Sequence, residues 1–155
     1  MATEHFFHVG ILVEDIDQAI DRFSEMLGIE FAGPETVPLT DLEEPGRDGP
    51  FELTLAYSKQ GPPHVELLEA TGDGVYGAHH GYGLHHYGTW TDDFDGEWSK
   101  LTARGMKPEA VFSSQDGRFG GFLDPRPLLG VRYEILSSAL KPDWEAWLRD
   151  ERPLI

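Results

Sequence analysis

Cysteine is absent from the 155-residue sequence, which excludes disulfide bonds, thiolate nucleophiles and thiolate metal sites. Basic residues are few, with 12 Lys and Arg against 28 Asp and Glu, and the formal net charge is −16. A field of that sign repels phosphate backbones and anionic headgroups, so we expect neither nucleic acid nor a membrane surface as a partner. It attracts divalent cations, and without cysteine any bound metal must be held by His and carboxylate groups.

Long apolar runs are also missing. None approaches the roughly 18 residues that a membrane-spanning helix needs, and the first residues lack the basic region and apolar core of a signal peptide. We therefore expect a cytoplasmic protein. Hydrophobic residues still make up 39% of the chain, which is adequate for the interior of one compact domain or of two half-domains that share a core.

The sequence does contain an internal repeat. His8, Gly10 and Asp15 recur with the same spacing as His86, Gly88 and Asp93. Each copy reads as strand, helix and three further strands. In the first copy we expect strands near 6–13, 29–32, 51–58 and 64–70 and a helix over 16–27; in the second we expect strands near 84–91, 109–113, 120–124 and 131–137 and a helix over 94–104. Asp15 and Asp93 are the expected N-caps of the two helices.

The segments outside these elements differ in character. Residues 33–50 are rich in Pro, Gly and acid and predict a loop, and Asp41–Asp48 within it is long enough to act as a lid. Residues 71–83 are the expected boundary between the copies. The tail from Pro142 predicts a short amphipathic helix whose aromatic stripe, Trp144 and Trp147, packs on the body of the protein or on a second subunit.

Each copy places one His on its first strand and one Glu on its last, which singles out His8, Glu66, His86 and Glu134. Taken singly, a strand His is more often structural and a strand Glu usually faces water. Equivalent placement in two copies favours a shared role, because a pseudo-twofold relation would bring all four to one point if their strands line a common cavity. Two imidazoles and two carboxylates suit one divalent ion such as Zn, Ni, Co, Mn or Fe(II) and leave positions open in a six-coordinate site.

Four other histidines need an assignment. His85 and His86 are adjacent, so alternation along a strand predicts that they face opposite sides and that only one is a ligand. The repeat register selects His86, and we expect His85 to pack or hydrogen-bond elsewhere. His64 should share the face of Glu66, which favours a contact with the site or the substrate. His79 and His80 form either a second metal-binding pair or part of a solvated loop.

The motifs resemble those of the vicinal oxygen chelate superfamily, which includes glyoxalase I, methylmalonyl-CoA epimerase, extradiol dioxygenases and bleomycin-resistance proteins. They are His8-Val-Gly, Leu27-Gly28, Val65-Glu66-Leu67-Leu68, Gly83-Leu84-His85-His86-Tyr87-Gly88 and Tyr133-Glu134-Ile135-Leu136, spread over most of residues 5–138. The resemblance is closest to the glyoxalase I and epimerase-like branch. It implies an α+β fold in which two paired βαβββ modules form a cupped mixed sheet with a pseudo-twofold internal repeat.

The resemblance also implies a domain organisation and a site. We expect a single domain over 1–155, made of module 5–70, module 84–138 and a C-terminal extension over 139–155. The family pattern places a divalent metal on residues matching His8, Glu66, His86 and Glu134, and it implies a homodimer.

The leading functional hypothesis is a metal-dependent lyase or isomerase, glyoxalase-like or epimerase-like, acting on a small carbonyl substrate. Two neighbouring substrate oxygens would chelate the metal, and Glu134 or Glu66 would remove a proton from the adjacent carbon. A carboxylate at both glutamate positions favours proton transfer over oxygen activation, because Fe(II) oxygenases of this fold typically use two His and one carboxylate.

Two other hypotheses stay open. One is an Fe(II)-dependent ring-cleaving dioxygenase. The other is a metal-free protein that binds an aromatic or cationic small molecule, which agrees with the negative charge and with Trp90, Phe119 and Phe122.

Two departures from the family pattern concern the substrate. Pro125–Gly130 replaces the turn that frequently precedes the last strand, so we expect a different cavity mouth there. The sequence also has no basic cluster to hold the phosphates of coenzyme A or the carboxylates of glutathione, although Lys59, Arg118, Arg126 and Arg132 remain individual candidates. This argues against both large anionic substrates.

Overall fold

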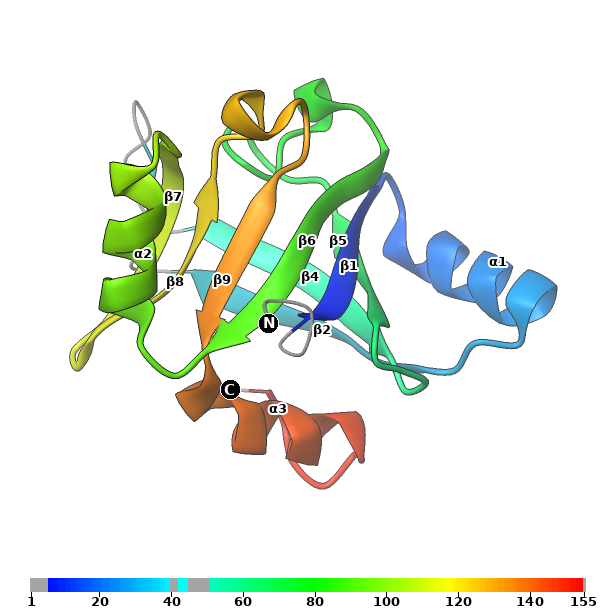
Figure 1. Ribbon diagram of the computed structural model, residues 1–155. Coiled ribbons are helices and arrows are strands. Elements are labelled where there is room, and N and C mark those ends of the chain that lie inside the picture. Colours follow the sequence, from blue (N-terminus) through cyan, green and yellow to red (C-terminus); the bar gives the residue numbers. More distant parts are fainter. Residues whose placement is uncertain (1–5, 40–41, 45–50, 155) are drawn as a thin grey trace.

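The computed structural model describes residues 6–39, 42–44 and 51–154. Its regular elements follow one another along the chain as β1 (Phe6–Val13), α1 (Ile16–Leu27), β2 (Phe31–Leu39), β3 (Leu42–Glu43), β4 (Phe51–Ser58), β5 (His64–Glu69), β6 (Gly83–Thr91), α2 (Phe94–Ala103), β7 (Pro108–Ser114), β8 (Gly117–Leu123), β9 (Tyr133–Ser137) and α3 (Lys141–Leu148). Figure 1 shows a curled sheet with α1 and α2 at its two sides and α3 beneath it.

Within the described chain the strands form one nine-stranded sheet in the order β2-β4-β5-β1-β6-β9-β8-β7-β3. The first strand of each module pairs in parallel with its last strand, β1 with β5 and β6 with β9. The two modules join through antiparallel pairing of β1 with β6 at the centre of the sheet. This arrangement confirms the predicted α+β fold of two βαβββ modules, and the strand pairing repeats around a pseudo-twofold axis between β1 and β6. The module and extension boundaries remain predictions.

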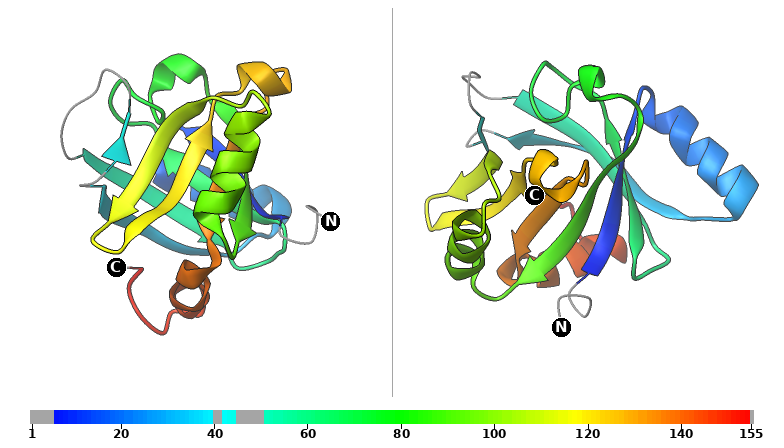
Figure 2. Two further views of the ribbon diagram at one scale, coloured as in Figure 1. Left: turned by 60° about the vertical axis from the view of Figure 1, so that its left-hand side comes forward. Right: turned by 45° about the horizontal axis from the view of Figure 1, so that its top comes forward.

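The sheet is strongly curled, as both views in Figure 2 show. The short strand β3, which lies between β2 and β4 in the sequence, pairs with β7 at the other end of the sheet. The first module therefore reaches across to the second, and the concave face becomes a cup.

The two helices begin in the same way. The Asp15 carboxylate accepts a hydrogen bond from the backbone N–H of Gln18, and the Asp93 carboxylate accepts one from Gly96, both at 2.9 Å. These are the predicted N-caps, and they satisfy N–H groups that have no partner within the helix. α1 packs through Ile16 on one half of the sheet, and α2 packs through Phe94 and Trp98 on the other.

The largest apolar cluster fills the concave side. It includes Phe7, Tyr57, Trp90, Phe112 and Phe122 from the strands. Trp144 and Trp147 of α3 are also buried in this cluster. The C-terminal helix therefore packs on the body of the same chain, which was one of the two positions predicted for it.

The predicted loop over residues 33–50 is wrong in its first part. β2 continues to Leu39 and pairs with β4 from Glu35 onwards, after a register shift that follows Ala32. β2 is an edge strand, where Pro34 and Pro38 are tolerated because one side of the strand needs no N–H donors.

The proposed lid, Asp41–Asp48, lies partly outside the described residues, namely at 41 and 45–48. Its described part forms β3 and continues to Glu44, whose carboxylate accepts a hydrogen bond from the Val75 N–H at 2.6 Å. In the described part of the chain no helix is long and apolar enough to cross a membrane. The cytoplasmic location remains a prediction.

Candidate metal centre

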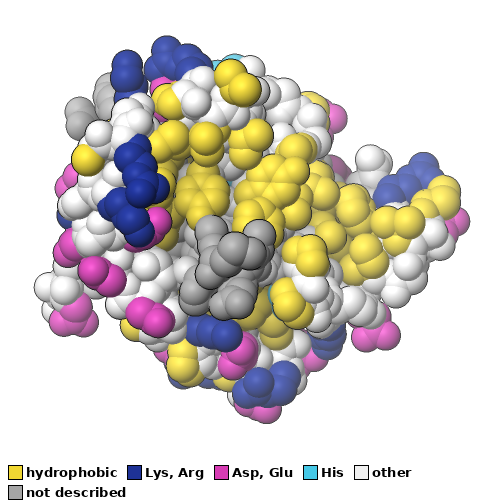
Figure 3. All heavy atoms as spheres, in the orientation of Figure 1, with side chains coloured by type: hydrophobic (Ala, Val, Ile, Leu, Met, Phe, Trp, Pro, Cys, Tyr) yellow, Lys and Arg dark blue, Asp and Glu magenta, His cyan; other side chains and the backbone are white. Residues whose placement is uncertain are grey.

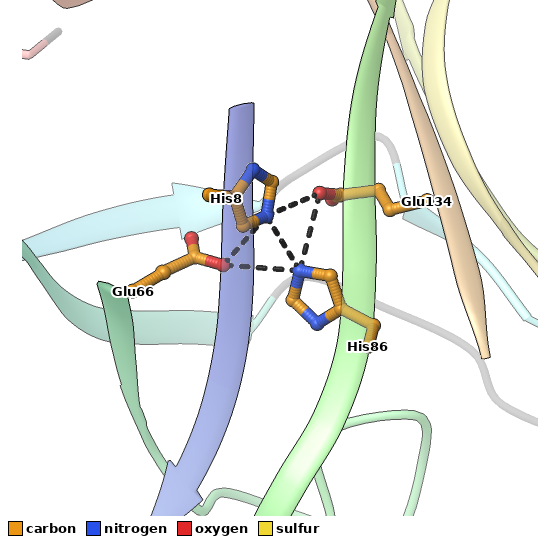
Figure 4. A group of neighbouring side chains, drawn as sticks. All are labelled: His8, Glu66, His86 and Glu134. Carbon is orange, nitrogen blue, oxygen red and sulfur yellow. Dashed lines mark hydrogen bonds and ion pairs between the residues drawn. The ribbon is translucent and has the colours of Figure 1, made fainter. Parts of the chain in front are cut away.

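The sheet brings the four predicted ligands together from four neighbouring strands. His8 lies on β1, His86 on β6, Glu66 on β5 and Glu134 on β9, and their side chains converge between the strands (Figure 4). All four are buried, with exposed fractions of 0 to 6%. The repeat therefore supplies two residues from each module to one point on the concave side.

Two glycines lie between the converging side chains. Gly10 is registered with Glu66 on one side and with His86 on the other. Gly88 is registered with His8 on one side and with Glu134 on the other. Two rows therefore run across the sheet, Glu66-Gly10-His86 and His8-Gly88-Glu134. The glycine in the middle of each row has no side chain, which leaves space for the neighbouring imidazole.

The interatomic distances form a tight cluster. The two histidine Nε2 atoms lie 2.7 Å apart. Glu66 Oε2 is 3.2 Å from His8 Nε2 and 3.1 Å from His86 Nε2, and Glu134 Oε2 is 3.1 and 3.3 Å from the same two atoms. One potential ligand atom from each residue lies within 4.8 Å of all the others.

The electrostatics of the cluster are dominated by these four groups. Burial alone would lower the pKa of both histidines, but the two carboxylates outweigh burial, so the pKa of His8 is raised and that of His86 is raised to about 9. Burial alone would raise the pKa of both glutamates, but the histidines outweigh it and lower the pKa of Glu66 and of Glu134. The histidines and the glutamates thus stabilise each other's charged forms.

The donor set fits a divalent ion. The Oε2 atoms of Glu66 and Glu134 are buried and have no hydrogen-bond partner within the described residues. Neighbouring ligand atoms about 2.0–2.2 Å from one ion are separated by roughly 3 Å, which agrees with the contacts between the His nitrogens and the Glu oxygens. A divalent ion would balance the charge of the two carboxylates.

Strict alternation fails at both histidines. The β1–β6 pairing skips Phe7 and His85, each of which is the extra residue of a β-bulge directly before a predicted ligand. As a result His85 and His86 lie on the same side of the sheet. Both rings contact Phe122, and their Nδ1 atoms are 2.9 Å apart. The expectation that the two imidazoles face opposite sides is therefore wrong, although the Nε2 atom in the cluster belongs to His86.

Tyr57 lies beside the centre and was missed by sequence reasoning. It sits on β4 directly opposite Glu66 of β5, and its hydroxyl is placed to donate a hydrogen bond to the Glu66 carboxylate. Burial, the negative charge of Glu66 and Glu134, and this hydrogen bond raise the pKa of Tyr57 well above its ordinary value. Only the pairing of β4 with β5 reveals this contact, because nothing in the local sequence around Tyr57 marks it.

The remaining histidines of the described chain lie outside the centre. His64 is buried, but its Nδ1 lies 2.7 Å from the Ser58 carbonyl and its ring contacts Trp144, so it holds the turn between β4 and β5. His79 and His80 form a 3₁₀ turn at Ala78–His80, and they line a polar cavity of about 320 Å³ together with Asp124, Arg126 and Glu109. None of the four predicted ligands lines that cavity.

The four candidate cations for phosphate binding all have acidic partners. The pairs are Lys59–Asp150 at 2.5 Å, Arg118–Asp95 at 2.5 Å, Arg132–Glu109 at 2.7 Å, and Arg126–Asp124. Their charge is therefore already balanced within the protein.

Comparison with known proteins identifies the family. The sequence profile of the Glyoxalase/Bleomycin resistance protein/Dioxygenase superfamily matches residues 7–122. The chain belongs to this superfamily, which confirms the resemblance seen in the motifs. A search of curated proteins found no match.

Solved structures of methylmalonyl-CoA epimerases are similar to this chain. The enzyme from Streptomyces coelicolor in complex with 2-nitronate-propionyl-CoA is 25% identical, with a TM-score of 0.58 and coverage of 87% of this chain and 94% of the epimerase. The enzyme from Mycobacterium tuberculosis is 21% identical, with a TM-score of 0.60 and coverage of 86% and 87%. A hypothetical protein from Bacillus halodurans is 21% identical, with a TM-score of 0.60 and coverage of 85% and 92%.

Proposed function

We propose that this protein is a metal-dependent isomerase or lyase, glyoxalase-like or epimerase-like, that moves a proton next to the carbonyl of a small substrate. The observation that carries the proposal is the buried cluster of His8, Glu66, His86 and Glu134, whose carboxylate Oε2 atoms lack hydrogen-bond partners in the described chain. The similarity to epimerases, which catalyse isomerisation, supports the same reaction class.

The four residues would have the following roles. His8 and His86 would hold the ion, together with the two glutamates. A bound divalent ion would polarise the carbonyl of a substrate that reaches it through two neighbouring oxygens. Glu134 or Glu66 would accept the proton from the adjacent carbon. In an isomerase the same group would return the proton to the neighbouring carbon, whereas in an epimerase a second acid would have to supply a proton to the opposite face.

The surroundings of the centre favour this chemistry. The rings of Phe7, Tyr57 and Phe122 contact the two histidines and keep bulk water away from them. In such an apolar surrounding, charge that develops on the substrate is screened less than in water.

The substrate we propose is small and lacks a large phosphorylated group. Coenzyme A is part of the ligand in the Streptomyces coelicolor complex. In this chain, however, Lys59, Arg118, Arg126 and Arg132 each pair with a carboxylate, and the net charge is −16. Small ketones, hydroxy acids and short thioesters are therefore the compounds to screen.

We also propose a homodimer that forms through the outer face of β1 and β6. Figure 3 shows apolar side chains gathered over these strands and β9 and continuing onto α1. The face includes Leu84 of β6, which is 62% exposed and lies opposite Ile11 of β1. Sedimentation equilibrium of the wild type and of Leu84→Glu tests this surface: we expect a dimer that the variant disrupts, and a monomeric wild type would overturn it.

The metal content of protein purified without chelators tests the main proposal. We expect close to one divalent ion per chain in the wild type and its loss in His86→Ala and Glu66→Ala. Matched controls are His79→Ala and Glu52→Ala, which remove exposed residues outside the centre and should retain the metal. A wild type that neither contains a metal nor takes up added Ni, Co, Zn, Mn or Fe(II) would overturn the proposal and favour the metal-free binding protein.

Proton transfer is then measured directly. The loaded protein is incubated in D₂O with the substrate panel, and NMR follows deuterium that enters next to the carbonyl. Metal-dependent exchange is the expected result. Oxygen uptake with a catechol and Fe(II), without such exchange, would instead identify a dioxygenase.

A further inference from the structure

His85 connects the predicted ligand His86 to a backbone carbonyl. Its Nε2 lies 2.7 Å from the Val75 carbonyl oxygen, and its Nδ1 lies 2.9 Å from the Nδ1 of His86. His85 is buried and its ring stacks on Tyr76. Hydrogen-bonding rules assign the protons in this chain of contacts.

A carbonyl oxygen only accepts, so His85 Nε2 carries the hydrogen and donates it to Val75. In the neutral ring His85 Nδ1 then has a free lone pair, and His86 Nδ1 must be the donor. This leaves the lone pair of His86 on Nε2, the atom that faces Glu66 and Glu134. The Val75 carbonyl thereby selects the tautomer of His86 that can bind a metal.

In the other module, no described residue equivalent to His85 accepts a hydrogen bond from the Nδ1 atom of the predicted ligand. Phe7 occupies the bulge position that matches His85, and a phenyl ring cannot accept a proton from His8 in this way. The Nδ1 atom of His8 is buried and has no hydrogen-bond partner among the described residues. The two histidines of the centre therefore differ in how they are held.

The two glutamates also differ in their neighbours, because only one of them has a polar residue opposite it on the adjacent strand. Tyr57 pairs across the strands with Glu66, and its hydroxyl is placed to donate a hydrogen bond to the Glu66 carboxylate. Phe122 occupies the matching position opposite Glu134 and carries no hydroxyl. His86 and Glu66 are thus oriented by polar neighbours, whereas the matching neighbours of His8 and Glu134 are phenylalanines.

We propose that His85 and Tyr57 are positioning residues that fix His86 and Glu66 as the rigid half of the metal centre. This inference rests on the proposed function.

Metal affinity tests the proposal without a substrate. Isothermal titration with Co²⁺ measures the dissociation constant, and the visible spectrum of bound Co²⁺ reports the ligand arrangement. We expect His85→Phe and Tyr57→Phe to weaken binding by about 10- to 100-fold and to change the spectrum. His85→Asn should restore much of the affinity, because its side-chain oxygen can replace Nδ1 as the acceptor for His86.

Matched controls separate positioning from general destabilisation. His64→Phe removes a buried histidine that bonds a carbonyl without touching a ligand, and Tyr133→Phe removes a hydroxyl that bonds Thr89. Both should bind Co²⁺ like the wild type, and thermal melting of every metal-free variant checks the fold. Wild-type affinity and spectrum in His85→Phe and Tyr57→Phe would overturn the proposal while the proposed function stands. A wild type without Co²⁺ binding would overturn both.

The glutamates provide the second comparison. Glu66→Gln should weaken Co²⁺ binding at least about 10-fold more than Glu134→Gln, because Glu66 is the oriented ligand. Equal losses, or a larger loss in Glu134→Gln, would contradict the assignment of Glu66 as the more firmly held glutamate.

Discussion

The imidazole of His8 occupies the space that a side chain at residue 88 would need. A Cβ atom built on Gly88 would lie 1.8 Å from His8 Cε1, and one built on Gly10 would lie 2.0 Å from His86 Cε1. The contact is reciprocal between the modules, so the glycine of each repeat makes room for the histidine of the other. This explains why the spacing of His and Gly recurs together in the sequence.

Gly88→Ala is expected to displace the His8 ring and to weaken metal binding by at least about 10-fold, as other changes to the support of a ligand do. The new methyl group cannot coexist with the ring, so either the imidazole or the strand pairing must shift. Titration with Co²⁺ or Zn²⁺ measures the effect. Val9→Ala, on the outer face of β1, is the control and should bind normally; a Gly88→Ala variant that also binds normally would contradict the packing argument.

The metal affinity should increase as the pH rises. The pKa values of His8 and His86 are raised, so the stability that these groups give the metal-free protein is present below pH 6.5 and is lost as the pH rises through about 9. A metal competes with the same protons, so its affinity should rise over that window.

The measurement is the melting temperature of metal-free and loaded protein between pH 6.5 and about 9. The difference between the two forms should grow as the pH rises, and calorimetry in buffers of different ionisation enthalpy should detect proton release on binding. In acid the sign reverses for the glutamates: their lowered pKa values mean that their contribution is present above pH 4.5 and is lost as the pH falls. A pH-independent metal affinity would refute this account.

Free coenzyme A should not bind measurably. All four basic side chains that are candidates for holding its phosphates already pair with acids, and the surrounding charge is strongly negative. Calorimetric titration of the metal-loaded protein checks this. Methylmalonyl-CoA epimerase, titrated in parallel, is the positive control, and comparable affinity in the two proteins would show that the substrate argument is mistaken.

Removal of Trp144 should destabilise the whole cup. Its ring is 93% buried against Phe7, Tyr57 and Trp90. Trp144→Ala leaves a cavity there, and losses of about 3–5 kcal/mol are typical of such changes. Urea unfolding followed by circular dichroism gives the free energy of unfolding. Glu145→Ala on the same helix is the control and should change stability by about 0.5 kcal/mol or less.

Much of the fold could be predicted because its signals are local. Alternation marked most of the strands, and the two Asp caps with their apolar helical spacing marked α1 and α2. The full length of β2 could not be predicted, because Pro34 and Pro38 resemble a loop until the edge position of the strand is known. The convergence of His8, Glu66, His86 and Glu134 was expected from the repeat, while their roles as ligands and bases stay predictions.

The sequence by itself determined which residues could form the centre, since the recurrence of His, Gly and Glu in two modules specifies the donors and the glycines beside them. Only the tertiary structure decided how these donors are held. The bulges at Phe7 and His85, and the placement of Tyr57 opposite Glu66, depend on register between strands that are distant in the sequence. That register follows from the twist and closure of the whole sheet, which no local pattern of residues encodes.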